Sequence, residues 1–355
     1  MHFHDGAVPE EYLRYTGRKK LLLALGVTLS ACMLVAAVSV GSAGLPVHEA
    51  VASLLGMGDD KRIDLIVWSI RLPQALTAIT AGAGLAVAGA VMQSILRNPL
   101  GSPFTLGISQ AAAFGAAFSV MVLGSGIMTS TNAGAVTIAN PYLTTATAFC
   151  FCLLAACVII AVSRVRGASP ETMVLCGVAL GSLFTAGTMF LQYFADDVQL
   201  AAMVFWTFGD VARASWRELA FIAMVVVLSS IYFLFQSWNL NAIDAGDETA
   251  KGLGVRVERL RLVGMLVASL LTAVVVSFLG IIGFVGLVTP HMVRRLIGGD
   301  HRYLLPATIV LGALLLLAAD TAARLLLAPH ILPVSVLTAF LGAPVFLLLI
   351  LRRRS

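Results

Sequence analysis

Residues 219–261 read LAFIAMVVVLSSIYFLFQSWNLNAIDAGDETAKGLGVRVERLR, an uncharged run followed by a compact block of charge. The block contains Asp247, Glu248, Lys251 and several arginines, and a second run without Asp, Glu, Lys or Arg follows from Leu262 to Val293. Each run exceeds the roughly 20 apolar residues with which a helix crosses a bilayer core. The pattern predicts two membrane spans joined by a polar segment, which a soluble partner would contact.

The composition of the whole chain agrees with a membrane protein. Hydrophobic residues make up 59% and charged residues 12% of the 355 residues, about half the charged share of an average soluble domain. We therefore predict an all-α polytopic membrane protein with about ten transmembrane helices and no large domain outside the membrane. The expected organisation is a tail at 1–20, one transmembrane domain at 21–351 that includes the polar segment 244–261, and a tail at 352–355.

Uncharged runs and the turn residues between them predict where the spans lie. We expect them at Leu21–Ala43, Pro73–Leu96, Phe104–Gly126, Tyr142–Ser163, Ser169–Phe194, Leu219–Phe235, Leu262–Ile282, Pro290–Ile297, Leu304–Arg324 and Pro333–Leu351. The first run is too long for a signal peptide and lacks a convincing cleavage site, so it is interpreted as a span. Prolines at 99, 103, 290 and 333 are expected at helix ends, because proline lacks the N–H that a helix interior needs.

Small residues cluster in two of these spans. Gly82, Gly84 and Gly89 lie in the second span, and Gly280 and Gly286 lie near the end of the seventh. Such residues let helix backbones approach closely in a membrane. Close helix packing is the expected role, and lining a conduit is the alternative.

Loop charge orients the chain. With both termini inside the cell, 17 of the 23 basic residues fall in cytoplasmic segments, which is the asymmetry that the positive-inside rule requires. The six on the outer side are Lys61, Arg62, Arg71, Arg213, Arg217 and Arg324. This orientation predicts a multi-pass protein of the cytoplasmic (inner) membrane. The excess of positive charge then reflects loop asymmetry and not nucleic-acid binding.

The chain lacks the motifs of an enzyme. It contains no HExxH, no GxSxG and no phosphate-binding GxxxxGK[ST], so it has no catalytic residues of these types and would depend on a partner for ATP hydrolysis. Its five cysteines lie in apolar segments without histidine or acid nearby, and no metal site is expected. Asp320 and Arg324 are four residues apart and can pair on one helix face. His291 is expected to make a polar contact and not to ligate a metal.

The polar segment has the pattern of a short helix between two breaks. Gly246 interrupts the chain, Asp247 and Glu248 would complement the positive end of a helix dipole, and Gly252 and Gly254 would end the helix after barely two turns. Arg256 would then start a second short segment. Such a helix suits a cleft on a moving partner, and an ordinary solvated loop is the alternative.

Four blocks of the chain resemble the type II ABC importer permeases for iron-siderophore, haem and vitamin B12. Residues 246–255, GDETAKGLGV, resemble the family segment G-E-E-x-A-x-x-L-G-V. The blocks that start at Arg71-Leu72-Pro73, at Asn98-Pro99 and at Gly280 resemble the second span, the N-P-L-A-x-P turn and the C-terminal signature of the family. The matches run in order from about Leu45 to the C-terminus.

The resemblance implies roles for particular residues. By it, the ATPase-coupling residues are Gly246, Asp247, Glu248, Ala250, Lys251, Leu253 and Gly254. It matches Arg71 and Arg324 to arginines that dock the binding protein. Gln74 replaces a frequent family arginine, so Lys61 and Arg62 are alternative docking residues. The pathway residues by resemblance are Gly177, Val178, Gly181, Ser182 and Thr185, and the cytoplasmic turn is formed by Asn98, Pro99 and Pro103.

The resemblance also implies an assembly. It consists of a homodimer of permeases with a central pathway, two cytoplasmic ATPase subunits that bind ATP and Mg²⁺, and a periplasmic or lipoprotein solute-binding protein. No cofactor is expected on this chain. The expected function is ATP-driven import of an iron chelate, either a ferric siderophore or haem. Vitamin B12 is the alternative substrate, molybdate-type oxyanions come third, and the rival class is a secondary transporter or channel that acts without an ATPase.

Overall fold

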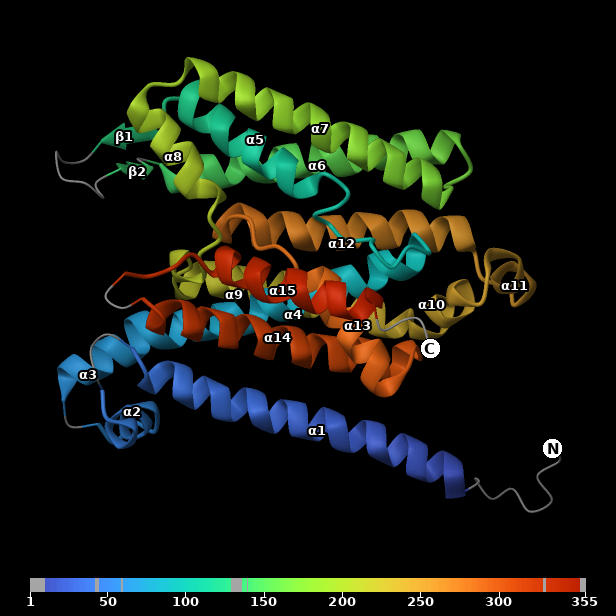
Figure 1. The fold of residues 1–355 in the computed structure, drawn as a ribbon, viewed down its shortest axis with the longest axis horizontal. Coiled ribbons are helices and arrows are strands. Elements are labelled where there is room, and N and C mark those ends of the chain that lie inside the picture. The colour runs from blue at the N-terminus through green and yellow to red at the C-terminus, as the bar shows by residue number, and fades with distance from the viewer. Residues whose placement is uncertain are drawn as a thin grey trace.

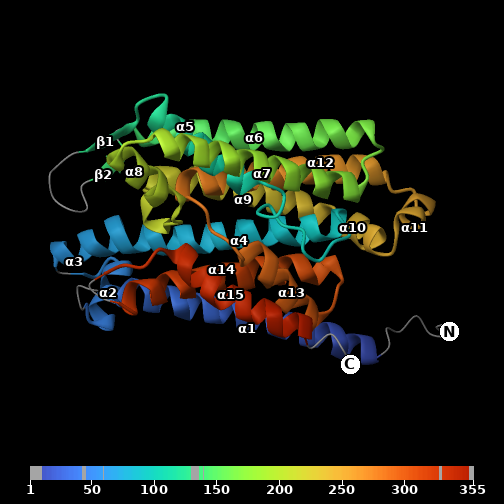
Figure 2. The same cartoon turned by 45° about the horizontal axis from the view of Figure 1, so that its top comes forward.

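The structure is a computed structural model that describes residues 10–41, 45–58, 60–128, 136–138, 140–327 and 330–351. The predicted tail at 352–355 and the first part of the tail at 1–20 lie outside these residues. The long helices run side by side as one bundle (Figures 1 and 2). The fold is therefore the expected all-α one.

Seven helices in the described part of the chain are long and apolar enough to cross a membrane. They are α1 (Glu10–Ser39), the continuous helix 61–95, α6 (Pro141–Val165), α7 (Pro170–Phe194), α9 (Trp216–Phe235), α12 (Val257–Leu279) and α14 (His301–Leu325). Within 61–95, α3 (Lys61–Ile66) passes through a π-helical turn (Val67–Arg71) into α4 (Leu72–Ile95). Shorter helices occupy the other predicted spans: α5 (Ile108–Met121), α13 (Val285–Ile297) and α15 (Val334–Leu351). Each of the ten predicted spans therefore coincides with a helix.

Short elements mark the two ends of the bundle. One end carries α10 (Ser237–Asp244) and α11 (Asp247–Gly252), together with the start of α1 and the end of α15 (Figure 1). We call it the α11 end. The opposite α2 end carries α2 (Val47–Leu54), α8 (Asp197–Thr207), a 3₁₀ turn (Val211–Arg213) and the two-stranded sheet of β1 (Gly126–Met128) and β2 (Val136–Ile138). Strands β1 and β2 are antiparallel, with Ile127 opposite Thr137.

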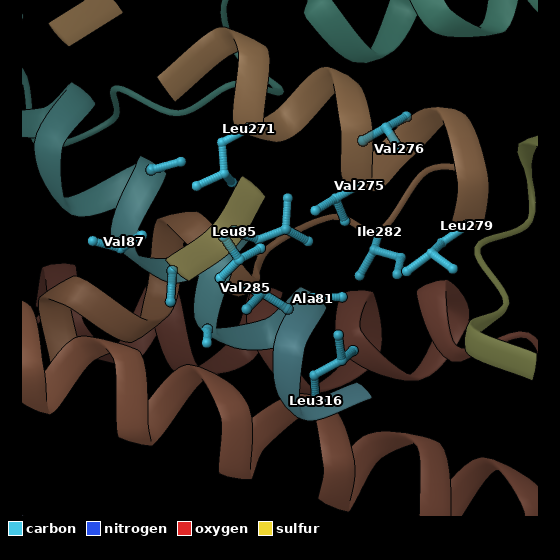
Figure 3. Packing of buried hydrophobic residues seen from close by; sticks show 14 of the residues in the cluster. Ala81, Leu85, Val87, Leu271, Val275, Val276, Leu279, Ile282, Val285 and Leu316 are labelled. Atoms are coloured by element: carbon cyan, nitrogen blue, oxygen red, sulfur yellow. The ribbon is translucent and has the colours of Figure 1, made fainter. Parts of the chain in front are cut away.

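Helix α4 is the centre of the bundle. Its most apolar window is 83% buried, against 11% for α1 and for α7. In Figure 3, Ala81, Leu85 and Val87 of α4 lie among side chains of α12, α13 and α14 such as Val275, Val285 and Leu316. Helices α1 and α7 therefore form the periphery, and α4 is held on nearly all sides.

Glycines allow this close packing. A Cβ at Gly89 would lie 1.8 Å from the carbonyl oxygen of Gly286 on α13, and one at Gly82 would lie 2.3 Å from that of Gly312 on α14. Neither distance is possible between real atoms, so helix backbones meet directly at both places, where Cα–H···O contacts contribute to packing. Close packing is confirmed as the role of these two α4 glycines.

Several helix boundaries differ from the predictions, and the second predicted span starts at Lys61 and not at Pro73. Helix α1 starts at Glu10 and not at Leu21, so part of the predicted tail is helical. The expected span Phe104–Gly126 is shortened to α5, because a turn held by Ser102 and Thr105 precedes it and Gly107, with a φ of 78°, stands at its N-cap. The expected short segment at Arg256 is wrong, because Arg256 is the N-cap of the long helix α12.

The expectation that Pro290 begins a helix is also wrong. Pro290 lies inside α13, which starts at Val285. Proline offers no N–H to the carbonyl four residues earlier, which belongs to Gly286. That carbonyl is the one packed against Gly89 of α4, so the missing hydrogen bond falls where α13 meets its neighbour.

Candidate functional site

The segment around α11 forms a short helix between two glycines with positive φ. Gly246 has a φ of 119° at the N-cap, and Gly254 has a φ of 82° after the helix. Both values lie in the region that glycine adopts without steric cost. Backbone bonds from Ala250 to Gly246, at 2.9 Å, and from Val255 to Ala250, at 2.9 Å, close the turns. The predicted acids stand in the first turn and Lys251 in the last.

Arg261 joins this helix to the bundle. Its side chain is 2% exposed, and its Nε donates to the Ile95 carbonyl at the end of α4 at 2.7 Å. One terminal nitrogen donates to the Ala168 carbonyl in the α6–α7 turn at 3.1 Å, and the other donates to both Asp247 oxygens at 2.9 and 3.1 Å. The planar guanidinium supplies several donors in a fixed geometry, which a lysine would not. Arg261 therefore couples α11 to α4 and to the turn that leads into α7.

The two acids of α11 have different surroundings. The Asp247 side chain is 27% exposed and belongs to the Arg261 ion pair. The Glu248 side chain is 89% exposed and pairs with Lys251 at 3.0 Å, which raises the pKa of Lys251. Leu253, 70% exposed, follows them. Asp247 thus anchors the helix, while Glu248, Lys251 and Leu253 form its free surface.

A buried polar network joins α10, the helix that precedes α11, to the bundle. The Oγ of Ser94 on α4 lies 2.8 Å from Nε2 of His301 and accepts from Arg294 of α13 at 3.1 Å. Asn241 of α10 contacts His301 Nδ1 through its Oδ1 at 2.9 Å and donates to Asp300 at 2.9 Å. These bonds fix α10 against α4, α13 and α14, so the base of α11 has a rigid support.

The pKa values of Asp244 and Asp300, two acids of this network, are shifted in opposite directions. Burial raises the pKa of Asp244, although Arg294 opposes the shift. Hydrogen bonds from Arg302, one of them 2.6 Å long, lower the pKa of Asp300 to about 2. Asp300 therefore remains a firm anchor for Asn241 at neutral pH.

The residues of the predicted cytoplasmic turn also lie at the α11 end. Asn98 accepts from the Leu100 amide at 2.9 Å through its side chain and from the Gly101 amide at 2.9 Å through its backbone. Nε2 of His291 on α13 lies 2.8 Å from the Pro99 carbonyl oxygen, so His291 makes the polar contact that was predicted. Pro103 follows in the same connection and lines a pocket of about 370 Å³ with Phe284 and Gly286 of the α13 region.

The five predicted pathway residues share one groove. It measures about 600 Å³ on the α7 surface and is lined by residues of α7, α5 and the preceding loop. From α7 these include Gly177, Val178, Gly181, Ser182 and Thr185. The floor is a close approach of Gly107 to Gly177 and Gly181, since a Cβ at Gly107 would lie 2.7 Å from the Gly177 oxygen. The groove is wide, open and mildly polar.

The predicted docking arginines lie at the α2 end, but their contacts are internal. Arg71, 5% exposed, donates to the carbonyls of Val38 and Ser39 on α1 at 2.8 and 2.7 Å. Arg324 pairs with Asp320 at 3.1 Å, as its spacing predicted, and Asp320 also accepts from Gln74 at 3.0 Å. Lys61 and Arg62 are exposed at the start of α3. Within the part of the chain that the structure describes, these last two form no ion pair, and their side chains are exposed.

Sequence reasoning missed Arg261 and the Ser94–His301 network. Arg261 was counted among the cytoplasmic loop charges, although it is the last charge before the uncharged run 262–293. That border position, one turn inside α12, is the signal that could have indicated a buried partner. Ser94, Asn241 and His301 come from three distant parts of the chain, and nothing local in the sequence connects them.

Comparison with known proteins identifies the family. The family model described as the FecCD transport family matches residues 28–352, nearly the whole chain. The chain belongs to the FecCD transport family. The hemin transport system permease HmuU of Yersinia pestis is 39% identical over 81% of this chain and 84% of its own length. The cobalamin import permease BtuC of Halobacterium salinarum is 37% identical over 92% of this chain and 85% of its own.

A solved structure agrees with this assignment. It is described as a metal-chelate type ABC transporter in an inward-facing conformation, and it matches with a TM-score of 0.81 and 31% identity over 94% of this chain and 99% of its own. This FecCD chain is therefore a multi-pass ABC importer permease with a BtuC-like fold. The recognition made from the sequence motifs is confirmed.

Proposed function

We propose that this permease imports an iron chelate, either a ferric siderophore or haem, across the cytoplasmic membrane. The wide, mildly polar groove on α7 supports a bulky cargo, because small side chains leave room and offer few strong contacts. A hemin permease and a metal-chelate type transporter among the similar proteins support iron. Cobalamin is the second candidate, since the Halobacterium salinarum relative has nearly the same identity.

The α11 end would face the cytoplasm, with both termini there and α11 in contact with an ATPase subunit. The observation that carries this proposal is that the two sides of α11 have different surroundings. One side is fixed to the bundle by Arg261, and the other presents the exposed side chains of Glu248, Lys251 and Leu253. A helix anchored in this way would transmit a displacement by the ATPase subunit to α4 and α7, whereas a solvated loop would change its own conformation instead.

The remaining parts of the assembly follow from this orientation. Two copies of the chain would enclose a pathway lined by the α7 groove, and two partner ATPase subunits would bind ATP and Mg²⁺. A solute-binding protein would dock at the α2 end, where Lys61 and Arg62 have free side chains. Arg71 and Arg324 would support that surface through α1 and α14, and would reach the partner only if their internal bonds opened.

A binding screen tests the substrate. The cognate solute-binding protein is titrated with ferric siderophores, haem and cobalamin, and uptake of each bound ligand is then measured in proteoliposomes. The proposal expects binding and ATP-dependent uptake of an iron chelate. Uptake of cobalamin alone would select the second candidate and refute the iron proposal.

A further inference from the structure

A basic pocket lies beside the α11 segment and outside the contacts described above. It measures about 360 Å³ and opens at the α11 end between α9, α10 and the start of α12. Its lining residues are Tyr232, Gln236, Asn239, Gly254, Val255, Arg256, Arg259, Leu260 and Val263.

The two arginines of this pocket carry uncompensated charge. Arg256 and Arg259 are both exposed, and neither forms a hydrogen bond or an ion pair with a side chain among the described residues. Arg261 and Arg302 nearby are each paired with an aspartate. Glu258 lies between the two arginines in sequence, but it does not line the pocket. The pocket is therefore positive.

Amide groups add neutral donors to the same pocket. Gln236 accepts through its Oε1 from Nδ2 of Asn239 at 2.7 Å. This bond leaves the NH₂ group of Gln236 and the second N–H of Asn239 available as donors. Guanidinium and amide N–H groups together suit the oxygens of a phosphate.

An apolar surface continues from the pocket along the two long helices. Leu228 on α9, one turn from Tyr232, is 61% exposed, and Leu266 on α12, one turn from Val263, is 42% exposed. Residues three and four apart lie on the same face of a helix. The positive pocket is thus followed by an exposed apolar strip, formed by Leu228 and Leu266 on two membrane helices.

We propose that this pocket binds the phosphate headgroup of an anionic membrane phospholipid, with its acyl chains along Leu228 and Leu266. Basic pockets between transmembrane helices at a membrane surface bind such headgroups. An acidic surface of a soluble partner would also match Arg256 and Arg259, but it would leave the apolar strip unexplained. The site goes beyond the proposed function, and only its assignment to the cytoplasmic leaflet depends on the proposed orientation.

Lipid in this pocket would also restrain the α11 segment. Gly254 and Val255, which line the pocket, form the turn between α11 and α12. A headgroup bound to Arg256 and Arg259 would hold this turn against α9 and α10. Anionic lipid is therefore expected to slow hydrogen exchange at the Gly254 and Val255 amides.

The test measures lipid binding to the purified full-length chain. Native mass spectrometry compares phosphatidylglycerol with phosphatidylcholine for the natural sequence, for the double variant R256Q/R259Q and for a control variant. The control, R164Q/R166Q, removes two exposed arginines at the C-terminal end of α6. We expect selective retention of phosphatidylglycerol, a loss of at least about 10-fold in R256Q/R259Q and no change in the control.

Three outcomes would overturn the proposal. Equal loss in both double variants would mean that total charge, and not this pocket, retains the lipid. Full displacement of the lipid by inorganic phosphate would mean that the site binds a free anion. If R256Q/R259Q retained phosphatidylglycerol and lost the ATPase subunit in a pull-down, the two arginines would belong to the ATPase interface. A single variant, R259Q, provides the same readouts if the double variant does not insert.

Discussion

The substitution Asp247→Asn tests whether Arg261 anchors α11. The carboxylate accepts two bonds from Arg261, at 2.9 and 3.1 Å, and hydrogen bonds to charged groups contribute about 1.5–3 kcal/mol. Asparagine keeps the shape and one acceptor but loses the charge. Because Asp247 is 27% exposed and water screens part of the interaction, we expect a loss of about 1–2 kcal/mol.

This loss corresponds to about 5–30-fold more frequent opening of α11, since each 1.4 kcal/mol is tenfold. Hydrogen exchange measures it directly at the amides that close the helix, those of Ala250, Leu253, Gly254 and Val255. Local opening sets the exchange rate of such amides. Exchange in α12 and α14 should not change.

The neighbouring substitution Glu248→Gln is the matched control. It also removes one negative charge from α11, but Glu248 is 89% exposed and its ion pair among the described residues is with Lys251. We expect less than about a 2-fold change in exchange, as for most exposed pairs. Equal acceleration in the two variants, or none in Asp247→Asn, would refute the anchoring role of Arg261. Reversing both acids together would mix the two effects, so single variants are required.

Three further predictions concern packing, charge and the groove. Gly89→Ala should lower the melting temperature in detergent, because its Cβ would meet the Gly286 oxygen at 1.8 Å and overpacking costs about 1–3 kcal/mol or more. The control Gly264→Ala, whose nearest contact would be 3.6 Å, should leave the melting temperature unchanged. A larger decrease in Gly264→Ala than in Gly89→Ala would contradict the packing. Asp300→Asn should destabilise the protein at neutral pH, because the pKa of Asp300 is lowered from 3.8 to about 2 in the folded protein. Such a carboxylate stabilises the fold above a pH of about 3.8, and this contribution disappears as the pH falls through about 2. If the difference in unfolding free energy between the natural protein and the variant did not shrink in acid, the prediction would be contradicted. Ser182→Phe should fill the α7 groove and reduce uptake at an unchanged melting temperature. The control Leu175→Phe, on the same helix but outside the groove lining, should retain uptake. Unimpaired uptake in Ser182→Phe would show that the groove is not part of the pathway.

The helices were predictable from the sequence because each leaves a local pattern. Uncharged runs and the turn residues between them indicated the ten spans, and glycines 246 and 254 indicated the limits of α11. Asp320 and Arg324 paired as their spacing predicted, because both residues lie on one helix. Patterns within a single element therefore sufficed for the fold.

Contacts between distant elements were not predictable in this way. Pro290 lies inside α13, and the Gly286 carbonyl that it leaves without a donor packs against Gly89 of α4, which is far away in the sequence. Arg71 resembles an outer docking residue, yet it donates to the carbonyls at the end of α1. Arg261 connects three segments that only the folded chain brings together. Resemblance indicated which segment is expected to contact the ATPase, and the structure distinguished the anchored Asp247 of that segment from its exposed Glu248.

Uptake by reconstituted proteoliposomes tests the central proposal most directly. The chain is purified with its partner ATPase, and uptake of the loaded binding protein's ligand is measured with ATP, without ATP and with the variant Asp247→Asn. The proposal predicts uptake only with ATP, and reduced uptake per ATP hydrolysed in the variant. Uptake by this chain alone without nucleotide would contradict it.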